Sequence, residues 1–268
     1  MAVGNAGASD GDGLIVRTVL GDIPAAEFGV TMCHEHLLVR LDQVSFREPD
    51  DPLGRSMARR PVSLEMLGWL GWNWTSNLDN LVLDSESVAI DELGMYRQVG
   101  GRSLVDCTLP GIGRDPEALS RIARAANVNV VMGSGYYVES THPPRVAAMS
   151  QDEITAEIVG EFRRGVGDSG IRAGSIGEIG SSWPMTSREI TVFRAAGQAQ
   201  AELRCGLTVH PGRHPDSPIE ILELLREVGT DVTRVVMGHI ERTVMDPDRL
   251  GRLADTGCFI GTTCSARR

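Results

Sequence analysis

Two histidines stand two residues apart in the segment His34-Glu35-His36, directly after the apolar run 29–33. If that run is a β-strand, residues i and i+2 point to the same face, and both imidazoles project to one side. Two imidazoles presented in this way form a chelate that suits Zn²⁺ or a similar divalent ion. A His-x-His pair can also be an ordinary pair at a strand end, so a metal site needs further ligands.

Two more histidines occupy corresponding places. His210 ends the apolar run 206–209, and His239 follows the run 234–237 after one glycine. In β/α barrels the carboxyl ends of the strands meet at one rim, where catalytic groups gather. Four of the six histidines are therefore expected at a common rim, and the other two lie in loop segments.

An acidic residue lies inside another apolar run. Glu178 stands in the segment 174–180, between aliphatic residues and glycines. Burying a lone carboxylate is unfavourable, so an acid in such a strand needs a strong partner. A pair of divalent ions would supply one, and an arginine at the rim is the alternative.

The elements that must position these side chains follow from hydrophobic periodicity and capping signals. A short first strand is predicted within 14–20, and seven further apolar runs predict strands at 29–33, 103–107, 128–132, 174–179, 206–209, 234–237 and 258–261. Strands that alternate with amphipathic helices indicate a parallel sheet covered by helices, either a β/α barrel or a doubly wound sheet. A chain of 268 residues can form one such domain.

The helices between these strands carry recognisable start signals. Thr186 and Glu189 form a capping box. Ser217 is expected as the N-cap before Pro218, and Asp246 stands in the same relation to Pro247. The segment 39–84 does not fit the strand-helix rhythm, and it is expected to be an insertion that covers the barrel mouth.

Composition narrows the class of function. The formal net charge is −10, which disfavours a general attraction to nucleic acid or to anionic lipid, and a small-molecule substrate is expected. No segment is long and apolar enough for a membrane span, and the first residues lack the pattern of a signal peptide, so a cytoplasmic location is expected. The five scattered cysteines fit reduced thiols. All 26 basic residues are arginine, which excludes a Schiff-base lysine and a carboxylated-lysine metal bridge.

Six segments together resemble the phosphotriesterase family of the amidohydrolase superfamily, and most of all the animal phosphotriesterase-related proteins. They are Thr31–Leu37, Gly111–Asp115, Gly133–Tyr137, Gly177–Pro184, His210–Arg213 and Gly238–Thr243. The resemblance implies a (β/α)₈ TIM-type barrel of the metal-dependent hydrolase type over residues 14–261. It leaves residues 1–13 as a flexible start and 262–268 as a tail unlike the family.

The resemblance also implies two divalent metal ions per subunit, usually zinc, at the C-terminal rim. His34 and His36 would bind one ion, His210 and His239 the other, and Glu178 would bridge both. A hydroxide shared by the ions would attack an ester, lactone, amide or phosphotriester bond. Tyr136, Tyr137, Arg213 and Arg242 follow the ligand-bearing positions and are candidate substrate contacts, with packing or rim ion pairs as the alternative. Relatives are often dimers, so a homodimer is expected.

One part of the family pattern is not found. Relatives have an eighth strand that ends in an aspartate, which binds a metal and accepts a proton from the attacking water. Here about seven strands are expected, and the barrel is expected to be incomplete at its C-terminus. Two hypotheses therefore remain: a zinc-dependent hydrolase, or a catalytically impaired truncated barrel that binds metal or a partner without turnover.

Overall fold

Seven parallel strands form the central sheet of the computed structural model, which describes residues 13–263. Their order across the sheet is β11 (Phe259–Ile260), β10 (Val235–Met237), β9 (Leu207–His210), β8 (Ser175–Gly180), β7 (Asn129–Ser134), β6 (Ser103–Asp106) and β3 (Thr31–Glu35). Among the described residues, each neighbouring pair of strands is consecutive in the barrel order and parallel. This sequential order is that of a β/α barrel and not of a doubly wound sheet, so the expected α/β barrel fold is confirmed with seven strands.

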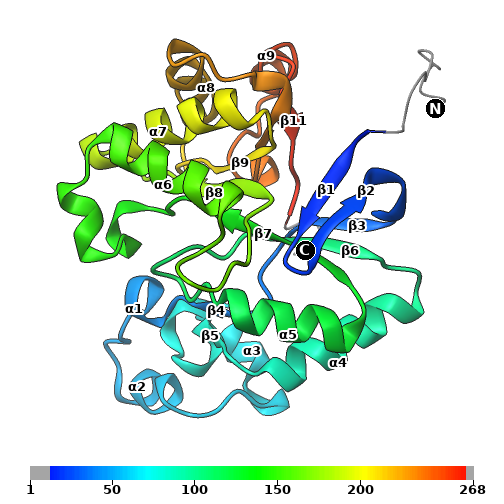
Figure 1. Ribbon diagram of the computed structural model, residues 1–268. Coiled ribbons are helices and arrows are strands. Elements are labelled where there is room, and N and C mark those ends of the chain that lie inside the picture. The colour runs from blue at the N-terminus through cyan, green and yellow to red at the C-terminus, as the bar shows by residue number, and fades with distance from the viewer. Residues whose placement is uncertain (1–12, 264–268) are drawn as a thin grey trace.

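The helices link consecutive strands and cover the outside of the curled sheet (Figure 1). They are α4 (Glu86–Gln98), α5 (Pro116–Ala126), α6 (Gln151–Arg163), α7 (Ser187–Leu203), α8 (Ser217–Glu227) and α9 (Pro247–Ala254). The capping box of Thr186 and Glu189 is formed, and the Asp246 side chain caps α9. The prediction for α8 was wrong. Its N-cap is Asp216, and the Ser217 hydroxyl instead accepts the Gly212 N–H.

A β-hairpin precedes the barrel strands. The strand predicted within 14–20 is β1 (Ile15–Thr18), and it pairs antiparallel with β2 (Gly21–Pro24). The Val19 N–H donates to the Val130 carbonyl near the start of β7. The hairpin therefore lies at the N-terminal ends of the strands, away from the rim that carries the histidines.

The segment 39–84 forms several short elements. They are β4 (Val39–Arg40), α1 (Asp42–Ser45), α2 (Pro52–Ala58), α3 (Leu67–Leu70) and β5 (Val82–Leu83). The antiparallel pair of β4 and β5 closes the segment at its base. Val39 packs with Leu109 and Ile112 in a separate apolar cluster that Tyr137 joins, so the segment packs against the loops that follow β6 and β7.

Eight 3₁₀ turns complete the secondary structure of the described residues. They are η1 (Ala25–Glu27), η2 (Leu64–Met66), η3 (Trp74–Ser76), η4 (Asp79–Leu81), η5 (Glu139–Thr141), η6 (Pro144–Ala148), η7 (Val232–Arg234) and η8 (Ile240–Arg242). Of the expected flexible start and the expected tail, residues 1–12 and 264–268 lie outside the described part of the chain. No helix within 13–263 combines the length and the apolar character that crossing a bilayer requires.

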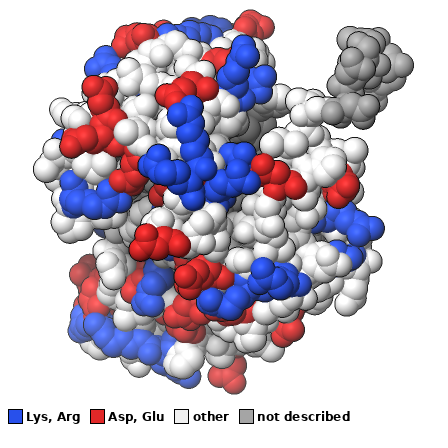
Figure 2. Space-filling view, in the orientation of Figure 1, with Lys and Arg blue, Asp and Glu red and all other residues white. Residues whose placement is uncertain are grey.

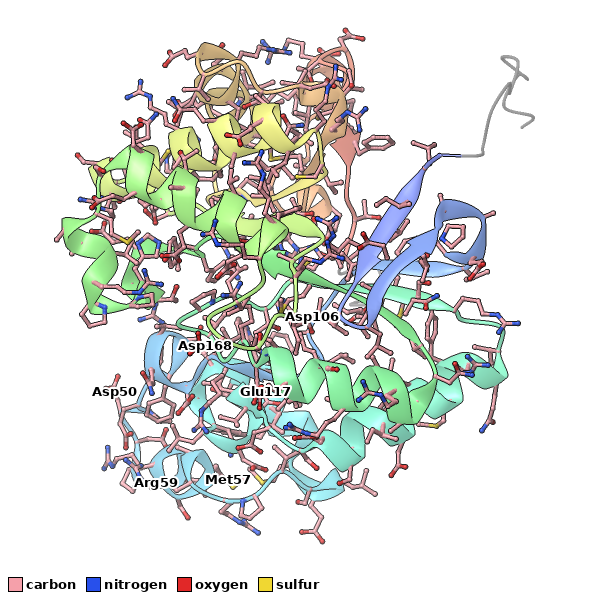
Figure 3. The ribbon with its side chains drawn as sticks, viewed as in Figure 1. Asp50, Met57, Arg59, Asp106, Glu117 and Asp168 are labelled. Carbon is pink, nitrogen blue, oxygen red and sulfur yellow. The ribbon has the colours of Figure 1, made fainter. Side chains whose placement is uncertain are left out.

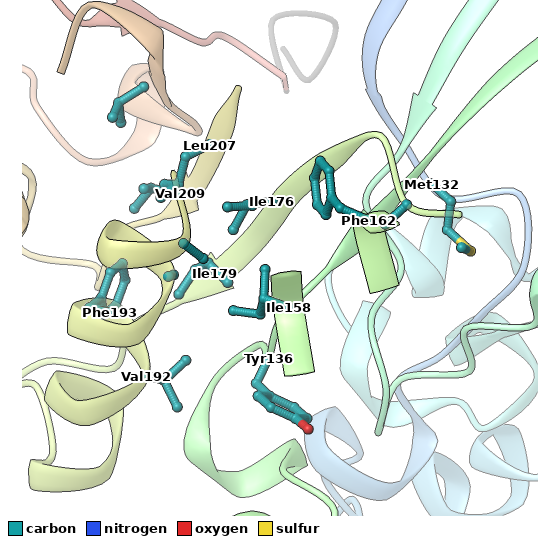
Figure 4. Packing of buried hydrophobic residues seen from close by; sticks show 14 of the residues in the cluster. Met132, Tyr136, Ile158, Phe162, Ile176, Ile179, Val192, Phe193, Leu207 and Val209 are labelled. Atoms are coloured by element: carbon teal, nitrogen blue, oxygen red, sulfur yellow. The ribbon is translucent and has the colours of Figure 1, made fainter. Parts of the chain in front are cut away.

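The core fills the space between the sheet and its helices. Figure 4 shows Ile176 and Ile179 of β8 with Leu207 and Val209 of β9, and Phe193 of α7 packs on the same cluster. All five side chains are fully buried. Strands of a parallel sheet are covered on both faces, which explains their nearly continuous apolar runs. This rigid layer fixes the strand ends from which the rim side chains project.

The molecular face in Figure 2 carries acidic and basic side chains in interspersed groups. Exposed pairs of opposite charge in the chain include Arg121 with Glu86 and Arg163 with Glu202. Such mixed charge gives no broad basic area on this face. The expectation that the chain does not bind nucleic acid stays a prediction.

Candidate metal centre

Four imidazoles and one carboxylate gather at the C-terminal rim. His34 lies on β3 and His36 directly after it, Glu178 lies on β8, His210 ends β9, and His239 follows β10 by two residues. The structure thus brings together all five residues that the sequence singled out as metal ligands. They come from four strands far apart in the sequence, because parallel strands present their carboxyl ends at one rim.

The Glu178 carboxylate is the centre of the cluster. Its Oε1 atom lies 2.7 Å from His239 Nε2, 2.9 Å from His210 Nδ1 and 3.3 Å from His34 Nε2. The side chain is 2% exposed. A buried carboxylate that meets three imidazoles on one oxygen has the partner that its burial requires.

Two groups of possible ligand atoms share this carboxylate. One is His34, His36 and Glu178, and the other is Glu178, His210 and His239, with the ligand atoms of each group within 4.8 Å of one another. Imidazole nitrogen and carboxylate oxygen are donors that suit zinc. In addition, the buried Nδ1 atom of His34 has no hydrogen-bond partner among the described residues. The donor set and the spacing therefore fit a pair of divalent ions bridged by Glu178.

Burial and charge act in opposite directions on these groups. Burial opposes ionisation of Glu178, but the neighbouring imidazoles, His210 foremost, outweigh it and hold the carboxyl pKa well below its ordinary value. Burial lowers the pKa of His36 to about 4. Burial also lowers the pKa of His34, but the Glu178 hydrogen bond and charge outweigh this effect and raise it. At neutral pH the Glu178 carboxylate is thus ionised beside a neutral His36 imidazole, and both are forms that bind a cation.

Two β-bulges lie beside the ligand positions. The register between β3 and β6 shifts between Met32 and Glu35, next to His34, and the register between β8 and β9 shifts between Ile176 and Ile179, next to Glu178. A bulge inserts one residue and turns the side chains that follow it. Gly177 has a φ of 97° within the second bulge. Its missing Cβ leaves room for the Thr208 carbonyl of β9.

The Gly177→Ala variant is expected to lose about 2 kcal/mol or more of unfolding free energy. An alanine Cβ would lie 2.1 Å from the Thr208 carbonyl oxygen, and the positive φ disfavours any side chain. Denaturant titration measures the loss. The matched control is Gly94→Ala within α4, where the added Cβ meets no atom within 4 Å. That control is expected to gain about 0.5–1 kcal/mol because alanine is the better helix former. Equal effects of the two substitutions would contradict this account.

The four candidate substrate contacts separate into two sets. The Tyr137 hydroxyl lies 3.1 Å from His210 Nδ1, and Arg242 Nη2 lies 3.4 Å from His210 Nε2. Burial and the Glu178 charge raise the pKa of Tyr137, and the charges of Arg242 and Arg213 oppose this rise. Arg213 follows β9 by three residues, beyond the strand end that carries His210. Tyr136 is directed elsewhere. Its buried hydroxyl donates to Glu157 of α6, so it packs outside the cluster.

Other polar residues near the strand ends have structural partners. Asp115 caps α5 by accepting the Ala118 N–H. His142 Nε2 lies 2.8 Å from the Tyr137 carbonyl, and the His214 ring stacks on Trp183 with centroids 4.2 Å apart. Neither histidine belongs to the two candidate ligand groups.

Sequence reasoning missed two residues that contact the histidine segment. The Thr108 hydroxyl lies 3.0 Å from His36 Nδ1. The fully buried Asp106 carboxylate accepts the N–H groups of Leu37 and Thr108. Burial raises the pKa of Asp106 to about 6. The available signal was an aspartate that ends an apolar strand, with a threonine two residues further on.

The comparison with known proteins gives concordant matches. Residues 15–264 match the model of the phosphotriesterase family. An N-acetyltaurine hydrolase of Homo sapiens is 37% identical over 246 residues, which are 91% of this chain and 70% of the relative.

Two solved structures are also similar. A resiniferatoxin-binding protein from Rhodobacter sphaeroides has a TM-score of 0.89 and 38% identity over 92% of this chain and 68% of its own. A phosphotriesterase homology protein from Escherichia coli, solved with phosphate in its active site, has a TM-score of 0.68 and 25% identity over 87% of this chain and 70% of its own.

Proposed function

Because the chain belongs to the phosphotriesterase family of hydrolases, we propose that it hydrolyses an amide bond of a small anionic molecule with the help of two zinc ions. His34 and His36 would hold one ion, His210 and His239 the other, and Glu178 would bridge them. The observation that carries this proposal is the pair of ligand groups that share one buried carboxylate.

The residues of the chain prepare this reaction in three ways. Glu178 supplies a fixed negative charge, because three imidazoles keep it ionised. The His34 and His239 side chains, 7% and 10% exposed, shield this carboxylate from bulk water. The Tyr137 hydroxyl lies beside His210, and its raised pKa keeps it protonated, so it would serve as a donor toward a substrate oxygen. When bound, a pair of zinc ions supplies Lewis-acid activation of water and of the substrate oxygen.

The charge of the rim supports an anionic substrate. The positive charges of Arg242 and Arg213 both oppose the rise in the pKa of Tyr137. They lie in a chain whose net charge is −10. Guanidinium groups bind sulfonate, phosphate and carboxylate groups through paired hydrogen bonds. The human relative is named for hydrolysis of N-acetyltaurine, an amide with a sulfonate. The Escherichia coli structure holds phosphate in its active site. We therefore propose an N-acyl amide with a sulfonate or a similar anion, with esters, lactones and phosphotriesters as alternative bonds.

The test combines metal analysis with a substrate panel. The purified chain is expected to bind two zinc ions and to hydrolyse N-acetyltaurine faster than N-acetylethylamine, its neutral analogue. A lactone and an aryl phosphotriester complete the panel. Bound metal without hydrolysis of any substrate would instead support a metal-binding barrel without turnover. Preference for the neutral amide would contradict the anionic substrate.

The variants Arg242→Met and Arg213→Met are each expected to lower kcat/KM for the anionic amide by roughly 10- to 100-fold, since a hydrogen bond to a charged group contributes about 1.5–3 kcal/mol. Their kcat/KM for the neutral amide should change little. The control is Arg194→Met, because Arg194 forms an exposed pair with Glu227 on α8. If both amides lose activity equally, the arginines do not select the anion.

Location and assembly stay predictions. Cys33, Cys107, Cys205 and Cys258 are free thiols, which supports the expected cytoplasmic location. The homodimer expected from the family is checked by sedimentation of the purified chain.

A further inference from the structure

The Thr108 side chain contacts the histidine segment from the neighbouring strand. Thr108 follows β6 by two residues, and its side chain is buried with the residue 1% exposed. Its hydroxyl donates to the Leu38 carbonyl at 2.9 Å and lies 3.0 Å from His36 Nδ1. One hydroxyl therefore contacts both the candidate ligand His36 and the backbone just beyond it.

The single proton of this hydroxyl decides the direction of the second contact. A threonine hydroxyl has one O–H donor and two acceptor lone pairs. Since the proton is directed at the Leu38 carbonyl, the oxygen can only accept from His36. The proton of the His36 contact must therefore lie on Nδ1. A neutral imidazole protonated on Nδ1 has its lone pair on Nε2.

Thr108 is itself held in place. The Asp106 carboxylate accepts the Thr108 N–H at 3.0 Å with Oδ1 and the Leu37 N–H at 2.8 Å with Oδ2. Asp106 thereby ties the chain after β6 to the residue that follows His36. Figure 3 shows Asp106 near the centre of the molecule, at the strands. The position of the hydroxyl relative to His36 is set by backbone contacts on both strands.

The other imidazoles of the cluster have different surroundings. His34 Nδ1 has no hydrogen-bond partner within residues 13–263, and His210 Nδ1 faces Glu178. His239 Nδ1 contacts the Thr263 hydroxyl. His210 also has a hydroxyl partner, Tyr137, but its Nδ1 lies closer to the Glu178 carboxylate. His36 is thus oriented by a contact that does not depend on Glu178.

We propose that Thr108 is a positioning residue that fixes the tautomer of His36, so that Nε2 presents its lone pair to the ion shared with His34. This step rests on the proposed metal centre. Partners of this kind orient a metal-binding histidine, and their removal typically weakens metal binding by about 10- to 100-fold. Thr108 does not itself contact the ion or the substrate.

The first experiment measures zinc affinity by competition with a chromophoric chelator. Thr108→Val keeps the shape of the side chain and removes the hydroxyl. It is expected to weaken zinc binding at the site formed by His34 and His36 by about 10- to 100-fold. Thr108→Ser keeps the hydroxyl and should restore affinity to within about threefold of the original chain. The matched control is Thr230→Val, because the buried Thr230 hydroxyl has no partner in the described residues. Unchanged affinity of Thr108→Val would overturn the proposal.

The second experiment reads the tautomer without metal or turnover. Imidazole ¹H–¹⁵N correlation spectra of the metal-free chain, with His36 assigned by a His36→Gln variant, are expected to show the proton on Nδ1. In Thr108→Val this preference should be lost. A proton on Nε2 in the original chain would overturn the proposal, even if Thr108→Val did not fold. If the tautomer is as expected but zinc does not bind, the proposed metal centre fails while the role of Thr108 in orienting His36 stands.

Discussion

Glu178→Gln is expected to abolish binding of one of the two zinc ions and to weaken binding of the other by more than about 100-fold. The carboxylate belongs to both candidate ligand groups, and it carries the only formal negative charge in them. Replacing a mere supporting partner of a metal ligand already weakens binding by about 10- to 100-fold, so loss of the shared ligand must exceed that range. Hydrolysis should fall with metal content. Elemental analysis after dialysis and zinc titration measure the effect.

The matched control is Glu35→Gln. Glu35 lies between His34 and His36, but it belongs to neither ligand group. This variant should keep two zinc ions. Removing zinc with a chelator should lower the thermal unfolding temperature of the original chain and of Glu35→Gln, because a ligand that binds only the folded state stabilises it by about 2.7 kcal/mol at a hundredfold excess over Kd. The same chelator should leave Glu178→Gln unchanged. Two tightly bound ions in Glu178→Gln would falsify the bridging role.

Arg114→Met is expected to destabilise the fold by about 3–5 kcal/mol. Arg114 forms a bidentate pair with Glu161 of α6, with N–O distances of 2.6 and 2.7 Å, and the two side chains are 5% and 10% exposed. The Ser134 hydroxyl at the end of β7 donates to the same carboxylate. Removing the guanidinium leaves a buried carboxylate without its counter-charge, which is far more unfavourable than losing an exposed pair. Urea denaturation of the metal-free chain measures the change.

Two further variants separate charge from packing. The double variant Arg114→Met with Glu161→Leu removes both charges and is expected to recover most of the lost stability, because buried pairs replaced by apolar side chains are often neutral. Arg121→Met breaks the exposed pair with Glu86 and should change the unfolding free energy by less than about 1 kcal/mol. If Arg121→Met lowers the unfolding free energy as much as Arg114→Met does, burial does not govern the contribution of these ion pairs to stability.

The rim residues were predictable from the sequence because strand ends are local features. Apolar runs mark the strands, and the residue that ends a run, such as His210, marks the rim. Glu178 was predictable because an acid inside an apolar run needs a partner. The parallel order of the strands then brings these distant positions together without any further signal.

Contacts between strands were not predictable in the same way. The contact of Thr108 with His36 depends on the register of β3 and β6, and a bulge shifts that register. Tyr136 and Tyr137 are adjacent in the sequence, yet only Tyr137 reaches the cluster. Both lie in the loop after β7, where no strand periodicity predicts the direction of a side chain. The N-cap of α8 was misplaced because the Ser217 hydroxyl accepts the N–H of Gly212, in the loop just before the helix, and Asp216 takes the N-cap position.

The segment between β4 and β5 is a separate insertion in the barrel. The two-residue ladder of β4 and β5 joins its two ends, and its Val39 and Leu41 pack with Leu109, Ile112 and Tyr137 of the barrel loops. The strands that present the imidazoles do not contribute to that ladder. Replacing the stretch between these two short strands would therefore change the surface beside the loops that follow β6 and β7, while the strands that carry the candidate ligand residues stay in place.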